Sequence, residues 1–263
     1  MRMLITGAAS GIGRAVALRA AELFPDAALF VTDANASALE ETVEAISKAG
    51  TKVWSSASDL SDPAVPERIV REAVGALGGL DSLVSNAGLL RPSSLLALDM
   101  EEYQLAFDVN TRPTWLLGKA AHAALSASGG TIVATASISS DQPSSGLGAY
   151  SPSKAALVML VRQMALEWGS DGIRCNGVSP GRTFTGMTAS AFNDETDPVQ
   201  MENRRRREAF IPLRKIGLPE EVANTILFLA GPLSSQITGV NVNVDGGQTL
   251  SLMPATGGGS GHR

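Results

Sequence analysis

Residues that build disulfide frameworks and metal centres are scarce in this sequence. One cysteine, Cys175, and two histidines, His122 and His262, occur among 263 residues. A single thiol excludes a disulfide within the chain, which favours a reducing compartment. His122 lies in an alanine-rich stretch and His262 near the end, so a zinc site or a Ser-His-Asp triad has little support. We therefore expect no metal, and chemistry that depends on other side chains.

Long apolar runs and an excess of positive charge are also missing. No uninterrupted apolar stretch reaches the ~20 residues of a membrane span. The run "MLIT" and a glycine turn follow the first residues so closely that we expect no signal peptide. The net charge of −5 indicates neither a nucleic-acid nor an anionic-membrane partner. We expect a cytoplasmic protein without either partner.

One basic run, "NRRRRE" at Asn203–Glu208, stands alone in this acidic chain. Such a run is typical of a solvated helix face. A site for a phosphate or a carboxylate is the alternative.

What the sequence does contain is an alternation of short β-type runs and longer helical patterns. Runs such as "LFV" and "TIVA" are apolar throughout, which is typical of strands covered on both faces. Strands separated by helices of ten or more residues connect through right-handed crossovers. The sequence therefore predicts an α/β fold with a doubly wound, mostly parallel, seven-stranded sheet and helices on both faces. Helices are expected at Arg14–Leu23, Ser37–Ala49 and Pro66–Leu77, in stretches that include Glu101–Ala127, and from near Tyr150.

The chain shows no linker and no internal repeat, so we expect residues 1–250 to form one domain. Residues 182–218 break the alternation and are a candidate substrate-binding lid. Residues 251–263 form a tail whose Gly-rich end we expect to be flexible.

A glycine-rich turn joins the first strand to the first helix. "ITGAASGIGRAVA" contains Gly7, Gly11 and Gly13. Glycines let backbone approach a pyrophosphate, and the following helix N-terminus offers free N–H groups and a positive dipole end. The spacing G-x-x-x-G-x-G differs from the usual dinucleotide fingerprint G-x-G-x-x-G, so a tight turn without a ligand is the alternative.

Asp33 ends the next strand in "LFVTD", about twenty residues after the last glycine. A carboxylate there accepts hydrogen bonds from a ribose 2′-hydroxyl and repels a 2′-phosphate. No Lys or Arg lies between Gly7 and Gly13 or directly after Asp33. The pattern favours NAD over NADP, and the alternative for Asp33 is a helix N-cap or a turn residue.

"GAYSPSKAAL" places Tyr150 four residues before Lys154. This spacing brings the phenol and the ammonium to one face of a helix, one turn apart. The pair alone is compatible with an ordinary surface contact or with a tyrosine whose titration the lysine controls.

The chain resembles the short-chain dehydrogenase/reductase family from "TGAASGIG" to "VNVDGG". Seven motifs, which follow one another in the family's order, carry this resemblance. "TGAASGIG" resembles the family's cofactor turn, and "SDLSD" resembles the segment beside the adenine. "SNAG" resembles N-N-A-G, with Ser85 in place of the first Asn. "DVNTR", "TASIS" and "YSPSK" resemble the segments that carry the active-site Asn, Ser and Y-x-x-x-K. "SPGRTFT" resembles the P-G-x-x-x-T segment near the nicotinamide.

This resemblance implies a Rossmann-type fold and a mechanism. Tyr150 would act as general base for alcohol oxidation or as acid for carbonyl reduction. Lys154 and the positive nicotinamide would lower the pKa of Tyr150, and Lys154 would also bond the nicotinamide ribose. Ser137 would hydrogen-bond the substrate oxygen, and Asn110 would hold a water that links Lys154 to solvent.

Ser137 and Asn110 also have simpler interpretations. The stretch "SISS" offers Ser139 and Ser140 as alternatives to Ser137. Asn110 is an alternative helix cap or kink.

The resemblance implies two further sets of residues. The expected cofactor contacts are Gly7, Ser10, Gly11, Ile12, Gly13, Asp33, Asp59, Leu60, Asn86, Ala87, Gly88, Tyr150, Lys154, Pro180, Gly181, Thr183 and Thr185. The expected substrate contacts are Ser137, Gln142, Tyr150, Arg182 and Met187. For Arg182, a contact with a substrate carboxylate competes with a solvent-facing or surface-paired arginine.

We therefore expect an NAD-dependent oxidoreductase that exchanges a hydride with a small-molecule secondary alcohol or ketone. The resemblance also implies a substrate pocket lined mainly by apolar residues, which suits a medium-sized, cyclic or aromatic substrate. The residues of this pocket are Leu89, Leu90, Gln142, Pro143, Leu147, Phe184, Met187 and Phe192. A non-catalytic NAD-sensing protein of the same fold, and a dehydratase or epimerase, are the alternatives. The family resemblance also implies a homo-oligomer, a tetramer or a dimer.

Overall fold

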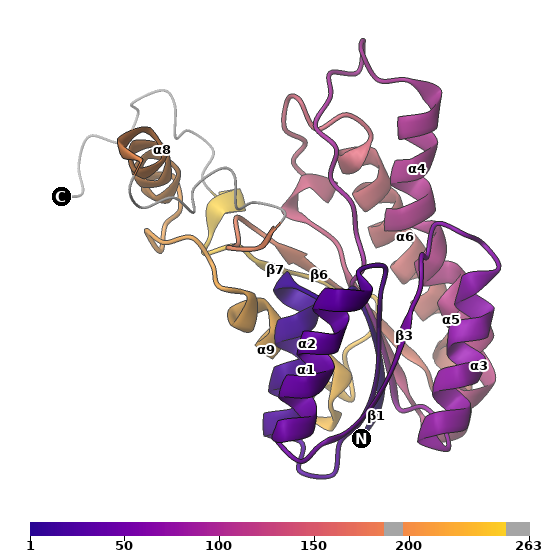
Figure 1. The fold of residues 1–263 in the computed structure, drawn as a ribbon. Coiled ribbons are helices and arrows are strands. Elements are labelled where there is room, and N and C mark those ends of the chain that lie inside the picture. Colours follow the sequence, from indigo (N-terminus) through magenta and orange to yellow (C-terminus); the bar gives the residue numbers. More distant parts are fainter. Residues whose placement is uncertain (187–196, 251–263) are drawn as a thin grey trace.

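The computed structural model describes residues 1–186 and 197–250 (Figure 1). Its centre is a seven-stranded sheet in the order β3-β2-β1-β4-β5-β6-β7, and every neighbouring pair is parallel. The α/β prediction is confirmed, and the sheet expected to be mostly parallel is parallel throughout the described residues. The strands are β1 (Arg2–Thr6), β2 (Ala28–Asp33), β3 (Lys52–Ala57), β4 (Ser82–Ser85), β5 (Thr131–Thr135), β6 (Arg174–Pro180) and β7 (Asn241–Val244).

Helices cover both faces of the sheet, as Figure 1 shows. One apolar core joins the sheet to α1 (Gly11–Leu23), α2 (Ala36–Lys48) and α9 (Pro219–Ala230). The other core joins it to α3 (Val65–Leu77), α5 (Arg112–Ser128) and α6 (Tyr150–Trp168), and α4 (Met100–Asn110) packs on α5 and α6. Because both faces are covered, β4 and β5 are buried along their whole lengths, and their central residues are apolar without alternation.

One helix begins a turn earlier than expected. Helix α1 starts at Gly11 instead of Arg14, so the end of the glycine-rich turn forms the first helical turn. The helical stretches expected to include Glu101–Ala127 are α4 and α5, which meet at Thr111, whose backbone leaves the helical region with φ −124° and ψ −58°. Pro113 supplies a physical reason, because a proline lacks an N–H donor and disfavours a helical preceding residue.

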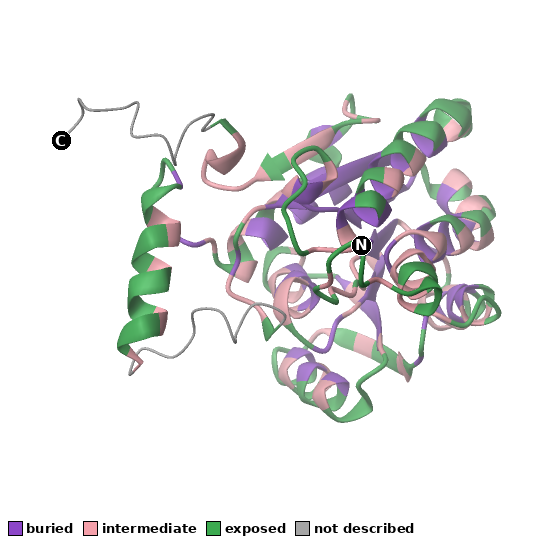
Figure 2. Ribbon diagram, turned by 90° about the horizontal axis from the view of Figure 1, so that it is seen from above, coloured by how far each residue is buried: buried purple, intermediate pink, exposed green. Residues whose placement is uncertain are grey.

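The candidate lid at 182–218 is only partly described. Its stretch 187–196, which includes the expected substrate contact Met187 and the expected pocket residue Phe192, lies outside the described residues, as does the tail at 251–263. The described part contains α8 (Pro198–Ala209), which has no buried residue and lies at the left edge of the molecule in Figure 2. No helix in the described ranges is both long and apolar enough to cross a membrane.

Candidate active site

A cleft of about 350 Å³ opens at the carboxyl ends of the strands. It lies where the strand order reverses, because the chain passes from β1 to β2 on one side and later to β4 on the other. Open α/β sheets bind ligands at this point. All of the expected cofactor contacts line the cleft except Gly13. Residues that the sequence did not single out also line it, namely Ala34, Ser58, Val109, Thr135, Ala136 and Gly186.

The glycine turn forms one wall of the cleft and fits a pyrophosphate. Gly7 has a φ of +66°, and a Cβ there would lie 2.9 Å from the backbone of Ala87. A Cβ on Gly13 would lie 2.0 Å from the Gly7 carbonyl oxygen, so Gly13 serves the close packing of turn and helix. Ser10 precedes α1 without a side-chain cap hydrogen bond. The first N–H groups of α1 are therefore available to an anion.

Asp33 lies at the end of β2 with its carboxylate held by backbone. Its two oxygens accept hydrogen bonds from the N–H groups of Ala9, at 3.0 Å, and Asn35, at 2.9 Å. The N-cap of α2 is Asn35, which accepts from Ala38, so Asp33 is not the cap. Each carboxylate oxygen has a second lone pair, and the pair suits a ribose diol.

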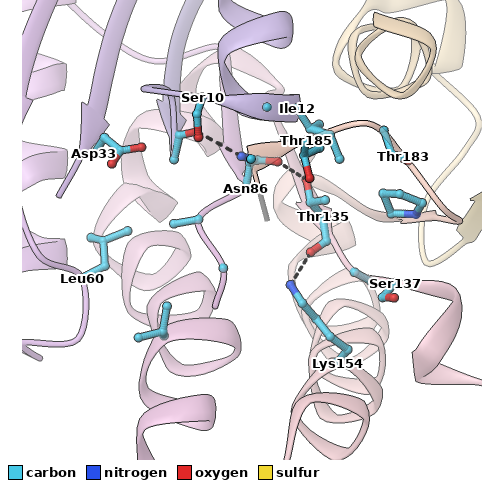
Figure 3. Close-up of a pocket in the computed structure, with 18 of the residues that line it drawn as sticks. Ser10, Ile12, Asp33, Leu60, Asn86, Thr135, Ser137, Lys154, Thr183 and Thr185 are labelled. Carbon is cyan, nitrogen blue, oxygen red and sulfur yellow. Dashed lines mark hydrogen bonds between the residues drawn. The ribbon is translucent and has the colours of Figure 1, made fainter. Parts of the chain in front are cut away.

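A relay of hydrogen bonds connects this wall to the opposite end of the cleft (Figure 3). The side-chain amide of Asn86 donates to the carbonyl of Gly7 at 3.3 Å and accepts from the hydroxyl of Thr135 at 3.0 Å. The backbone carbonyl of Thr135 accepts from Lys154 Nζ at 2.8 Å. In addition, the Thr6 hydroxyl accepts the N–H groups of Asn86 and Ala87. The relay joins the ends of β1, β4 and β5 to α6.

Tyr150, Ser137 and Lys154 lie together at the far end of the cleft. Burial raises the pKa of Tyr150, and a hydrogen bond with Ser137 lowers it by less. Lys154 Nζ lies 5.9 Å from the centre of the Tyr150 ring, and burial lowers the pKa of Lys154 to about 8. Desolvation of the phenol outweighs the hydrogen bond with Ser137, so the pKa of Tyr150 lies above its ordinary value, and the lowering expected from Lys154 together with the nicotinamide stays a prediction.

The three candidate serines separate clearly. Ser137 lines the cleft, whereas Ser139 and Ser140 do not. Ser137 also begins the short helical turn η1 (Ile138–Ser140), where its hydroxyl accepts the Ser139 N–H at 3.1 Å.

Asn110 is buried at the break between α4 and α5. Its side-chain oxygen accepts from Leu89 N–H at 2.7 Å, and its amide donates to the Leu89 carbonyl and to Ser153 Oγ, both at 3.0 Å. These contacts satisfy both amide protons and match the kink interpretation, whereas the water expected at Asn110 stays a prediction. A Cβ on Gly88 would lie 3.3 Å from Asn110 Oδ1 and from Lys154 Nζ, so Asn110 still borders the lysine.

The expected substrate contacts are not all brought together. Gln142 does not line the cleft; its side chain donates to the Thr249 carbonyl at 2.9 Å, which ties the loop before α6 to the turn η5 (Gln248–Leu250). Arg182 lies between Gly181 and Thr183, which line the cleft, but does not line it itself. A smaller hollow adjoins Tyr150, and it includes Leu89 and Arg91.

Comparisons with known proteins agree with this fold and cleft. The model of a family described as "Enoyl-(Acyl carrier protein) reductase" matches residues 7–249. A 2,3-dihydro-2,3-dihydroxybenzoate dehydrogenase of Escherichia coli (strain K12) is 37% identical over 94% of this chain and 96% of its own. An L-rhamnose 1-dehydrogenase (NAD(P)(+)) of Sphingomonas sp. (strain SKA58) is 33% identical over 95% of this chain and 96% of its own.

A solved structure shows the same similarity. The structure of a 7α-hydroxysteroid dehydrogenase complexed with NADH and 7-oxo glycochenodeoxycholic acid has a TM-score of 0.84 and 29% identity, over 93% of this chain and 92% of that chain. The chain belongs to the short-chain dehydrogenase/reductase family. It is an oxidoreductase that acts on CH–OH groups with a nicotinamide cofactor.

The relay predicts a specific effect of Thr135→Val. The substitution keeps the shape of the side chain but removes the hydroxyl that donates to Asn86 Oδ1. Leaving a buried acceptor unpaired costs about 1–3 kcal/mol. We expect the dissociation constant for NADH, measured by fluorescence titration, to rise about tenfold, since 1.4 kcal/mol corresponds to that factor.

Thr131→Val is the matched control, because Thr131 lies on the same strand and its buried hydroxyl bonds Ser82 Oγ at 2.9 Å, away from the cleft. We expect this control to lose stability in urea denaturation without a change in NADH affinity. Equal NADH affinities for the two variants would contradict a role of the relay in shaping the cleft.

Proposed function

We propose that this protein is an NAD-dependent dehydrogenase or reductase for secondary alcohols and ketones, with Tyr150 as its general acid/base. The observation that carries the proposal is the convergence of Tyr150, Ser137 and Lys154 at one end of the cleft. A nicotinamide there supplies the hydride chemistry when the cofactor is bound. Pro180, Gly181 and Thr183 line the cleft beside this end and are the residues proposed to hold the ring.

Tyr150 would move the proton of the reacting hydroxyl. Burial favours the neutral phenol, so Tyr150 rests in the form that donates a proton to a carbonyl oxygen. In the direction of oxidation, the phenolate needs added positive charge, and Lys154 together with the positive ring of oxidised cofactor supplies it. Ser137, already bonded to the phenol, would hold the same substrate oxygen as charge develops.

Lys154 would bond the nicotinamide ribose through the protons that it does not give to Thr135. Asn110 would act as a positioning residue, because its amide fixes Leu89 and Ser153 around the lysine. A proton path to solvent along this side would then use atoms other than the Asn110 side-chain amide.

The preference for NAD over NADP is part of this proposal. At the adenosine end the cleft carries two acids, Asp33 and Asp59, and among the described residues that line it the only cation is Lys154. A 2′-phosphate beside Asp33 would meet repulsion without compensation. The glycine turn, with Ser10, Gly11 and Ile12, is proposed to hold the pyrophosphate, and Leu60 to cover the adenine.

The proposed substrate is a ring-bearing secondary alcohol or the corresponding ketone. Apolar residues around Tyr150, such as Leu89 and Leu98, support a substrate with apolar bulk. The relatives named for a dihydrodihydroxybenzoate and a hydroxysteroid support the same class. The segment 182–218 is proposed to close over it.

We also propose that the protein forms a homotetramer or a dimer and that it resides in the cytoplasm. Large exposed apolar side chains support an assembly: Trp115 on α5 is 44% exposed, and Met159 and Leu166 on α6 are 60% and 79% exposed. The single buried cysteine supports a reducing compartment. Sedimentation of the purified protein measures the assembly, and a monomer would rule it out.

Tyr150→Phe tests the chemistry. Without the phenolic hydroxyl no group remains to move the proton, so we expect turnover of secondary alcohols to fall by at least about 10²-fold. NADH binding should stay within about twofold, because the ring itself is kept.

The chain offers a matched control in its second tyrosine, Tyr103, which is 42% exposed on α4. Tyr103→Phe should retain wild-type turnover in an NADH-absorbance assay. Wild-type turnover by Tyr150→Phe would sink the mechanism, and NAD binding without turnover by the unaltered protein would favour the NAD-sensing alternative.

Asp33→Asn tests the cofactor preference. The substitution removes the charge that repels a 2′-phosphate, so the ratio of kcat/KM with NAD to that with NADP should fall about tenfold or more, equivalent to about 1.4 kcal/mol. Asp62→Asn is the control, because Asp62 caps Ala64 N–H and does not line the cleft. A wild-type preference for NADP, or an equal shift in both variants, would refute the role of Asp33.

A further inference from the structure

Arg182 occupies a fixed position at the edge of the cleft. The residues on both sides of it, Gly181 and Thr183, line the cleft at the end where Tyr150 lies. Its backbone is pinned, because the Arg182 carbonyl accepts Gly217 N–H at 2.9 Å and Gly181 N–H donates to Val244 at 3.0 Å. A long cationic side chain therefore starts from a hydrogen-bonded backbone next to this end of the cleft, although Arg182 itself does not line the cleft.

Two arginines of α8 face the segment that contains Arg182. The guanidinium of Arg204 lies 4.8 Å from the centre of the Phe184 ring. Arg207 is three residues further on, so it shares a helix face with Arg204. Both are half-buried, whereas Arg205 and Arg206 are exposed. The face of α8 that turns toward residues 182–184 thus carries two arginines and one acid, Glu208, and α8 stands beyond the ends of β6 and β7 in Figure 1.

The acids around Arg182 are already engaged. Asp245, whose Cβ would lie 2.6 Å from a Cβ on Gly181, accepts the N–H groups of Gly247 and Thr249, both at 2.8 Å. Glu221 pairs with Lys215 and accepts Leu218 N–H. Glu208 pairs with Arg204 at 3.1 Å. Within residues 1–186 and 197–250, no acid forms an ion pair with Arg182.

The charge of Arg182 is consequently uncompensated by these neighbours. Burial lowers the pKa of its guanidinium, and the charge of Arg207 lowers it further. The residue keeps contact with solvent, so the desolvation acts on only part of the side chain. A guanidinium remains charged under such conditions, and both unfavourable contributions are relieved by an anion beside it. The planar fork of arginine matches the two oxygens of a carboxylate.

We propose that Arg182 binds a carboxylate of the substrate, so that the preferred substrates are ring-bearing hydroxy acids or oxo acids rather than neutral alcohols. The inference rests on the proposed function for the position of the reacting carbon at Tyr150. It adds a second anchor, which holds the far end of the substrate while the hydroxyl faces Ser137. Two anchored ends fix the orientation of the reacting carbon.

Binding is tested with benzoate and benzamide, which share a ring and differ in charge. Each is titrated calorimetrically into protein saturated with NADH. We expect wild-type protein to bind benzoate at least about tenfold more tightly than benzamide, the usual scale for a charge-assisted hydrogen-bonded pair. Arg182→Gln should abolish this difference, and Arg205→Gln, a matched change on the exposed side of α8, should retain it.

Turnover adds an independent readout. The substrates are 3-hydroxycyclohexanecarboxylate and its carboxamide. We expect kcat/KM to be about tenfold higher for the acid than for the carboxamide in the wild type and in Arg205→Gln, and equal for the two substrates in Arg182→Gln. Activity on the carboxamide should be equal in the wild type and in Arg205→Gln, and an unchanged NADH affinity of Arg182→Gln separates lost anion binding from misfolding.

The outcomes distinguish the inference from the function that it extends. Equal binding of benzoate and benzamide by the wild type, or unchanged discrimination in Arg182→Gln, overturns the carboxylate site. A loss of NADH affinity in Arg182→Gln without a change for benzoate assigns Arg182 to the cofactor phosphates instead. Benzoate discrimination that depends on Arg182, in a protein that oxidises no alcohol, supports the anion site and refutes the proposed function.

Discussion

The amide of Asn86 is the contact on which the rest of the site depends. It joins the carbonyl of Gly7 to the hydroxyl of Thr135, and the carbonyl of Thr135 in turn holds Lys154. Parallel strands place their carboxyl ends at one edge of a sheet, but pairing within the strands does not fix the loops beyond them. Asn86 supplies that fixation across three strand ends. The two ends of the cleft therefore keep their separation, which a dinucleotide that spans them requires.

Much of the fold and the cleft was predictable because the determining signals are local. Consecutive residues are enough to predict the apolar strands, the helices and the glycine turn. Asp33 is predicted as a cofactor contact from its position at the end of a strand. Thr135 could not be singled out, because its role comes from a neighbour 49 residues away. Ala34, Ser58 and Val109 line the cleft because of where the fold places them, and nothing in their residue types indicates it.

The surroundings of Tyr150, Lys154 and Asn110 could not be predicted from their spacing in the sequence. Sequence spacing brings Tyr150 and Lys154 together, but it gives no measure of how much water surrounds them. Desolvation dominates for both groups, so the phenol is held neutral and the pKa of the lysine falls to about 8. Likewise, the motif around Asn110 marks its place but not its hydrogen-bond partners, which come from Leu89 and Ser153.

The bond between Gln142 and the Thr249 carbonyl has a practical meaning for anyone who attaches this protein to something else. It connects the loop that leads into Tyr150 with the last described turn of the chain, so a displacement of that turn bears on the loop before α6. Met1 lies at the opposite end of the strands, where β1 begins, as Figure 1 shows. We therefore expect an affinity handle or a surface linkage at the amino end to leave this loop undisturbed, and one at the carboxyl end to act on it.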